Sequence, residues 1–241
     1  MNYARIKAVT RIALGETDST NSYWTDAEID AMINDSQLQV ATDAPCLLTY
    51  KEVATVVGDG RYSLPTDFLQ LKEVELDITT SLRRSLKMLS FDEFSSVSSG
   101  NYTNQGQPAF FKMEFGGVNI TDEIPGDIWL YPIPDAIYPA LRIYFYQKPT
   151  DLSNTTDVSE LPESLHWAIV YHVTAMLSLK NDDTRKFQEM MGLYNFQINQ
   201  ANAMLNRMDR SGPKHTKDSM GYTQTSLRAG GGTVSTRRRH R

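Results

Sequence analysis

Hydrophobic residues recur at helical spacing near both ends of the chain and alternate along its middle third. Between Pro162 and Arg207, two amphipathic stretches flank the polar connection 180–183. This pattern predicts an antiparallel helical hairpin, with Pro162 in a first-turn position and Asp182 or Asp183 capping the second helix. Its expected buried positions are Leu165, Ile169, His172, Val173, Met176 and Leu179, then Phe187, Met190, Met191, Tyr194, Ile198, Ala201 and Leu205. This apolar seam must pack against the N-terminal helices or against another copy of the chain.

The N-terminal part of the chain predicts two further helices. Apolar residues recur at helical spacing over 3–14, and Gly15 suits the position that ends such a helix. Thr25 and Glu28 form a capping box at the start of a second helix, which Pro45 stops.

The middle third changes to a period of two, which predicts β-strands. A Gly58-Asp59-Gly60 turn after Lys51–Val57 predicts a hairpin, with Tyr62 and Leu64 beginning the returning strand. Leu141, Ile143 and Phe145 alternate with Arg142, Tyr144 and Tyr146, so this strand has one buried face and one tyrosine-bearing face. Further strands are expected at 74–78, 109–115, 118–120 and 127–131, with a Gly116-Gly117 hairpin turn and a short helix at 91–97.

The order of helices, strands and helices predicts an α+β fold. We expect residues 1–45 and 162–207 to form one helical bundle. Residues 46–161 would form an inserted antiparallel β-sandwich or small barrel, with its loops at 98–107 and 121–126 at the periphery. Residues 208–241 have almost no large apolar side chains, so they would form an extended C-terminal arm.

Charge distinguishes this arm from the rest of the chain. The net charge is −5, yet residues 207–241 hold nine of the 24 Lys and Arg residues and only two of the 29 Asp and Glu residues. An acidic body with a basic tail predicts a tail that docks on an acidic protein surface, contacts DNA phosphates or stays an unbound solvated end, and these alternatives are favoured in that order. The candidate docking residues are Thr223, Gln224, Thr225, Ser226, Leu227, Arg228, Arg237, Arg238, Arg239 and Arg241.

The residues that could carry chemistry do not combine into a site. Cys46 is the single cysteine, which excludes a disulfide framework. Glu163 and His166 have the spacing of di-iron helices but lack the second copy that such a site needs. His172 lies on the apolar stripe and is expected to be a satisfied core histidine. We therefore expect no enzymatic activity, no cofactor and no metal.

Two further expectations concern location and nucleic acid. No apolar run reaches the roughly 18 residues of a membrane span, and no signal peptide is recognised, so the product is expected in the cytoplasm. Trp129, Tyr138, Tyr144 and Tyr146 allow an aromatic platform for single-stranded nucleic acid, although strand packing or subunit contact is favoured. A sequence-independent nucleic-acid-binding module acting through the basic tail is the alternative function.

Four segments in order resemble the adaptor proteins that join portal and tail in tailed bacteriophages. They are Leu64–Leu71, Ile128–Pro134, Leu141–Pro149 and Leu161–Val170, and the likeness spans residues 20–206. The resemblance implies a homo-oligomeric ring, typically a dodecamer, in the virion neck beneath the portal protein. It implies that the helices face the portal, and that the β-domain faces a downstream tail or nozzle protein. Packaged DNA would pass through the ring with little specific binding, and the C-terminal arm would reach into the portal.

Overall fold

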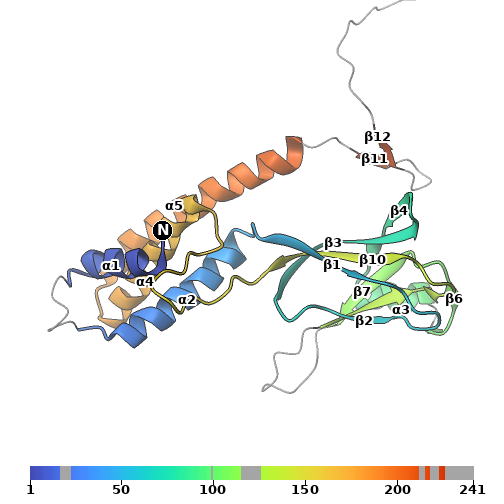
Figure 1. The fold of residues 1–241 in the computed structure, drawn as a ribbon, viewed down its shortest axis with the longest axis horizontal. Coiled ribbons are helices and arrows are strands. Elements are labelled where there is room, and N and C mark those ends of the chain that lie inside the picture. Colours follow the sequence, from blue (N-terminus) through green and yellow to red (C-terminus); the bar gives the residue numbers. More distant parts are fainter. Residues whose placement is uncertain (17–22, 99, 115–125, 212–214, 218–222, 226–241) are drawn as a thin grey trace, which may run out of the picture.

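The computed structural model describes residues 1–16, 23–98, 100–114, 126–211, 215–217 and 223–225, with two bodies joined end to end (Figure 1). The helical body contains α1 (Tyr3–Leu14), α2 (Asp26–Asp43), the 3-10 turn η1 (Glu163–Leu165), α4 (His166–Lys180) and α5 (Thr184–Ser211). Residues from the four α-helices share one hydrophobic core. Helices from the N-terminal part of the chain and from residues 163–211 therefore pack in one helical body.

Local signals start and end these helices. Thr25 and Glu28 form the predicted capping box of α2, and Gly15 ends α1 in the left-handed conformation at φ 87°. Asp183 caps α5, because its side chain accepts a hydrogen bond from the backbone N–H of Lys186 at 3.0 Å. Among the described residues, no helix is long and apolar enough to cross a membrane.

Helix α4 is the centre of the helical body, because α1, α2 and α5 all pack on it. It is therefore buried on more than the one predicted face. Val170 and Leu177 are buried although they lie outside the predicted seam. Of the seam residues, Met176 is only half-buried and Leu179 is 44% exposed. The predicted seam is wrong at these last two positions, because a helix with neighbours on several sides loses its one-sided pattern.

Two four-stranded sheets form the second body. The first has the order β1 (Leu48–Val53), β10 (Ala140–Gln147), β3 (Phe68–Thr79), β4 (Leu82–Ser85), and all of its pairings are antiparallel. The second has the order β2 (Arg61–Ser63), β8 (Asp127–Tyr131), β7 (Phe110–Glu114), β5 (Lys87–Met88), with β5 parallel to β7. Both sheets contribute to one hydrophobic core, with Leu76 and Ile143 from the first and Phe111 and Ile128 from the second.

The described strands do not close into a barrel, so that alternative is wrong. The predicted hairpin after Val57 is also wrong, because β1 pairs with β10 and β2 pairs with β8. The turn instead carries the chain from one sheet to the other, and the Gly58 N–H donates to the Pro134 carbonyl at 2.9 Å. The expected strand 118–120 and its Gly116-Gly117 turn lie outside the described residues.

Smaller elements complete this body. The short strands β6 (Gln105–Gly106) and β9 (Ile133–Pro134) pair in parallel, so part of the loop expected at 98–107 is ordered by pairing. Helix α3 (Phe91–Ser98) begins at a capping box in which Ser90 and Glu93 exchange hydrogen bonds. The expected helix at 91–97 is thus confirmed.

The connection from β10 to α4 packs on the helical body. Leu152 exchanges backbone hydrogen bonds with the Asn34 side chain at 2.9 and 3.3 Å, and Gln37 donates to the Thr150 carbonyl at 2.8 Å. The buried side chains of Leu152 and Leu161 join the helical core. This connection is therefore a strap along α2 as well as a link between the bodies.

Candidate docking surfaces

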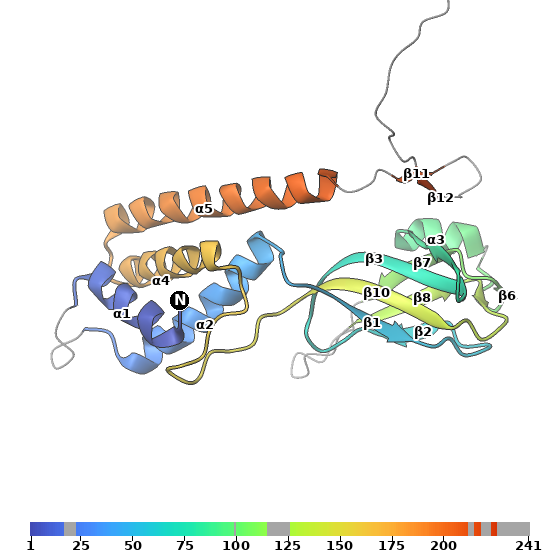
Figure 2. The same ribbon diagram turned by 45° about the horizontal axis from the view of Figure 1, so that its top comes forward.

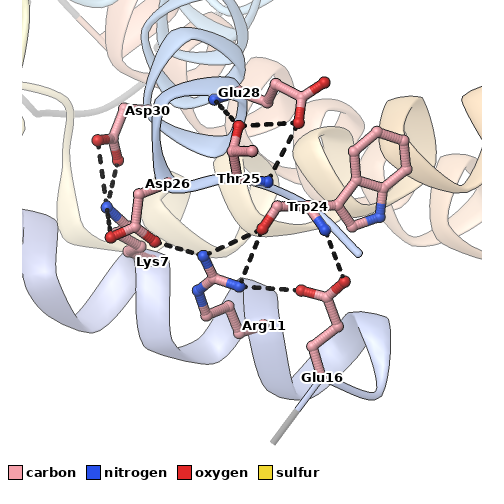
Figure 3. A network of polar contacts seen from close by, with 8 residues as sticks. All are labelled: Lys7, Arg11, Glu16, Trp24, Thr25, Asp26, Glu28 and Asp30. Atoms are coloured by element: carbon pink, nitrogen blue, oxygen red, sulfur yellow. Dashed lines mark hydrogen bonds and ion pairs between the residues drawn. The ribbon is translucent and has the colours of Figure 1, made fainter. Parts of the chain in front are cut away.

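A network of charged side chains closes the end of the helical body that lies away from the sheets (Figure 3). Lys7 Nζ lies 2.9 Å from Asp30 and 3.2 Å from Asp26. Arg11 pairs with Glu16 at 2.9 Å and with Asp26, and its hydrogen bond to Asp26 is the largest cause that lowers the pKa of that carboxyl. The network therefore fixes α1 against the first turn of α2.

The same end is tied to the end of α4. Lys180 Nζ donates to Glu28 at 2.9 Å and lies 5.0 Å from the centroid of the Trp24 ring. The Lys180 hydrogen bond, with those of Thr25, lowers the pKa of Glu28 to about 2. The end of α4, where the chain turns into α5, is thus held against the start of α2.

A buried polar cluster joins α2, α4 and α5 inside the body. His172 Nδ1 shares a hydrogen bond with Ser36 Oγ at 2.8 Å, and its ring centroid lies 5.1 Å from that of Tyr194. Tyr194 donates its hydroxyl to Asp43 at 2.5 Å, and burial raises the pKa of that phenol. His172 is therefore the satisfied core histidine that the sequence predicts.

This cluster makes the stability of the helical body depend on pH. Burial lowers the pKa of His172, while the charge of Asp43 partly opposes that shift. Because the pKa of His172 is lower in the folded state, the unfolded chain takes up a proton first as the pH falls. The fold is therefore at its full stability when the pH lies above the unfolded pKa of about 6.5, where the ring is neutral in both states. That stability falls as the pH drops from there through the folded pKa.

Thermal melts between pH 7.5 and 5 should show a melting temperature that falls with the pH. The fall should be smaller in the H172Q variant, because glutamine does not take up a proton in this range. An equal fall of the melting temperature in both proteins would contradict the assignment.

His166 has a structural role as well. Its Nε2 lies 2.9 Å from the Leu161 carbonyl, and its Nδ1 contacts the Met1 amine. Within the described ranges, no group of three or more His, Cys, Asp and Glu residues is placed to hold a metal ion. Burial raises the pKa of the half-buried Cys46 thiol, which disfavours the nucleophilic thiolate.

The four aromatic residues considered as a nucleic-acid platform lie in three different places. Tyr138 is buried in the core between the sheets, and Trp129 belongs to the second sheet. Tyr144 and Tyr146 lie on the outer face of the first sheet, where the rings of Tyr50 and Tyr144 are tilted by 43° with their centroids 5.7 Å apart. A single platform is therefore not formed, and the tyrosine-bearing face of β10 is present as predicted.

Trp129 instead helps to hold α3. Lys112 is 8% exposed, and its Nζ lies 4.6 Å from the Trp129 ring, 5.0 Å from Phe91 and 5.4 Å from Phe94. The Arg61 guanidinium lies 5.2 Å from the same indole ring. These cation–π contacts stabilise the packing of α3 on the second sheet.

An open groove of about 470 Å³ lies between the first half of β3 and the strands β5 and β7. Apolar side chains dominate its lining, including Phe68, Leu71, Met88 and Met113. A groove of this character suits contact with another protein segment more than binding of a polar substrate.

The predicted docking arm is described in part. Residues Thr223–Thr225 form β12, which pairs antiparallel with β11 (His215–Lys217), so this segment is a hairpin strand and not an unpaired extended chain. Ser226, Leu227, Arg228, Arg237, Arg238, Arg239 and Arg241 lie outside the described residues. Their docking role stays a prediction. Helix α5 continues through Ser211, four residues into the segment expected to be the arm.

Sequence reasoning missed a second apolar face on α5. Leu193 is 41% exposed, Phe196 58% and Met204 60%, and none belongs to the buried seam. Phe196 follows Leu193 by three residues and precedes Met204 by eight, which places all three on one side of the helix. This spacing was visible in the sequence. Figure 2 shows α5 lying along α4 and running on past it toward the sheets.

Residues 1–218 match the family model of the SU10 adaptor protein. The chain belongs to the SU10 adaptor protein family. This membership confirms the resemblance to phage adaptors in its general form and makes the chain a structural component of a virion that contacts other phage structural proteins. No curated protein matches the chain.

Proposed function

We propose that this SU10 adaptor protein forms a homo-oligomeric ring, a dodecamer, beneath the portal in the neck of a tailed phage. The observation that carries the proposal is the family match over residues 1–218. The two-body shape supports it, because a helical end and a sheet end offer two chemically different docking surfaces (Figure 1). The adaptor works without a reaction or a cofactor, by joining portal to tail and lining the DNA exit channel.

The helical body faces the portal, and the sheets face the next tail or nozzle component. The C-terminal arm is the segment that reaches the portal, through the residues that follow the β11–β12 hairpin. Its arginines supply attraction to carboxylates or DNA. The acidic remainder of the chain suits a channel through which a repelled duplex slides.

Light scattering of the purified protein, alone and mixed with portal, tests this function. A defined complex that contains portal and about one adaptor per portal subunit is expected. A protein that stays monomeric and separate from portal would overturn the proposal. A protein that binds duplex DNA through its tail but ignores portal would favour the nucleic-acid-binding alternative.

A further inference from the structure

We propose that neighbouring copies join through α5 of one copy and α2 of the next, with Phe196 and Gly192 of α5 facing Leu38 of α2. This inference rests on the proposed ring and names the surfaces that build it. Four features of the described residues support it: the exposed face of α5, an unexplained glycine, the outer face of α2, and the placement of both helices around α4.

The outer face of α5 is apolar and unusually long. The helix has 28 residues, against 15 in α4, and its contacts with the helical core end at Ala201. Phe196 and Met204 are exposed on the side away from that core. A helix that overhangs its own domain with exposed apolar residues gains most of its stability from a partner.

Gly192 points to a helix as that partner. It lies inside α5 one turn before Phe196, where glycine is the least favourable residue apart from proline. A Cβ at this position would meet nothing within 4 Å, so packing within one copy does not require glycine. A missing side chain beside a large aromatic one gives a hole next to a knob, which allows another helix to approach closely.

The outer face of α2 has the complementary character. Ala27, Ala31, Leu38 and Thr42 are exposed and recur at helical spacing opposite the buried side of the helix. Asp35 lies on the same face and has no ion-pair partner among the described residues. Of the five acidic residues of α2, the other four are paired or hydrogen-bonded within the same copy, which leaves Asp35. The first two turns of α5 carry Arg185 and Lys186 against Glu189, so Asp35 of one copy has basic partners on the next. Small side chains and opposite charge both favour contact between these two helices.

The positions of α2 and α5 around α4 require that the contact joins two different surfaces, α5 of one copy and α2 of the next. Helices α2 and α5 both pack on α4 (Figure 2), and the residues of their outer faces are exposed, so these faces do not contact one another within one copy. An interface between two different faces is heterologous, and such interfaces close into rings when the rotation between copies allows it. A pair of identical faces would stop at a dimer.

Contacts within one copy show which residues of α2 and α5 lie at the same height along the long axis of the body, here called the level of a residue. Asp43 accepts a hydrogen bond from Tyr194 through its side chain and from Asn202 through its carbonyl, so the end of α2 lies beside the stretch between those residues. Leu38 precedes Asp43 by five residues, or about 7.5 Å of helix, which places it near the level of Leu193. Rotation about an axis along the body keeps that level, so Leu38 of one copy meets Leu193 and Phe196 of the next.

Two variants test the surface. G192L adds a side chain in open space, so it should melt no lower than the parent protein, yet block close approach and abolish ring formation. F196D should fold and fail to assemble as well. I137D is the matched control, because Ile137 is 72% exposed and lies in the β-body far from the proposed contact; it should assemble normally. Folded G192L and F196D proteins that assemble like the parent would overturn the inference.

Cysteine pairing then identifies the partner surface. In a C46S background, L38C with F196C should give oxidised ladders of linked copies, whereas L38C with M204C should give few. Ladders of equal yield from both pairs would contradict the predicted level. If the parent protein does not assemble even with portal, the proposed function fails; if it assembles without these contacts, only the inference fails.

Discussion

Replacement of Ile169 by aspartate is expected to prevent the helical body from folding. Ile169 is fully buried in α4, and α1, α2 and α5 all pack around that helix. An unpaired carboxylate there costs more than about 4 kcal/mol, a large part of the roughly 5–15 kcal/mol that stabilises a typical domain. Insoluble protein, or loss of the cooperative melting transition in circular dichroism, is the expected measurement.

L179D is the matched control for this change. Leu179 lies on the same helix and on the seam that the sequence predicts, but it is 44% exposed in the structure. Its substitution should therefore lower the melting temperature far less than I169D. A soluble I169D protein that melts like the parent would show that the packing around α4 is wrongly assigned.

Truncation after Ser211 is expected to leave the body intact and to weaken portal attachment sharply. The helical core uses residues of α5 only as far as Ala201, so the melting transition should not change. If the arm docks on the portal as proposed, binding should fall by at least about tenfold, because truncation removes its charge-assisted contacts and backbone pairing. Titration of portal with both proteins, by biolayer interferometry at two salt concentrations, measures the loss.

We expect the arginines alone to contribute part of this effect. Replacing Arg237, Arg238, Arg239 and Arg241 with serine should cost less than truncation, and the difference from the parent should shrink at high salt. Equal portal affinity for the truncated and full chains would remove the docking role of the arm. Normal portal binding with loss of DNA retention would assign the arm to DNA.

The sequence determined those features that depend on a few neighbouring residues. Thr25 with Glu28 and Ser90 with Glu93 started helices where expected, because a capping box satisfies backbone groups within one turn. The alternation from Leu141 to Tyr146 identified the buried face of β10, because side-chain direction in a strand follows from position alone. The basic character of the arm and the resemblance of ordered segments to phage adaptors also came from the sequence.

Tertiary structure decided which elements meet. Lys51–Val57 and Tyr62 carried ordinary hairpin signals, yet their strands belong to different sheets, because pairing depends on partners contributed by β8 and β10 far along the chain. The candidate contact surface on α5 could be recognised only after the seam had been assigned to the core. An apolar residue looks the same in sequence whether it packs inside its own chain or remains exposed for a partner, and only the packing of α4 against α5 separated Tyr194 from Phe196.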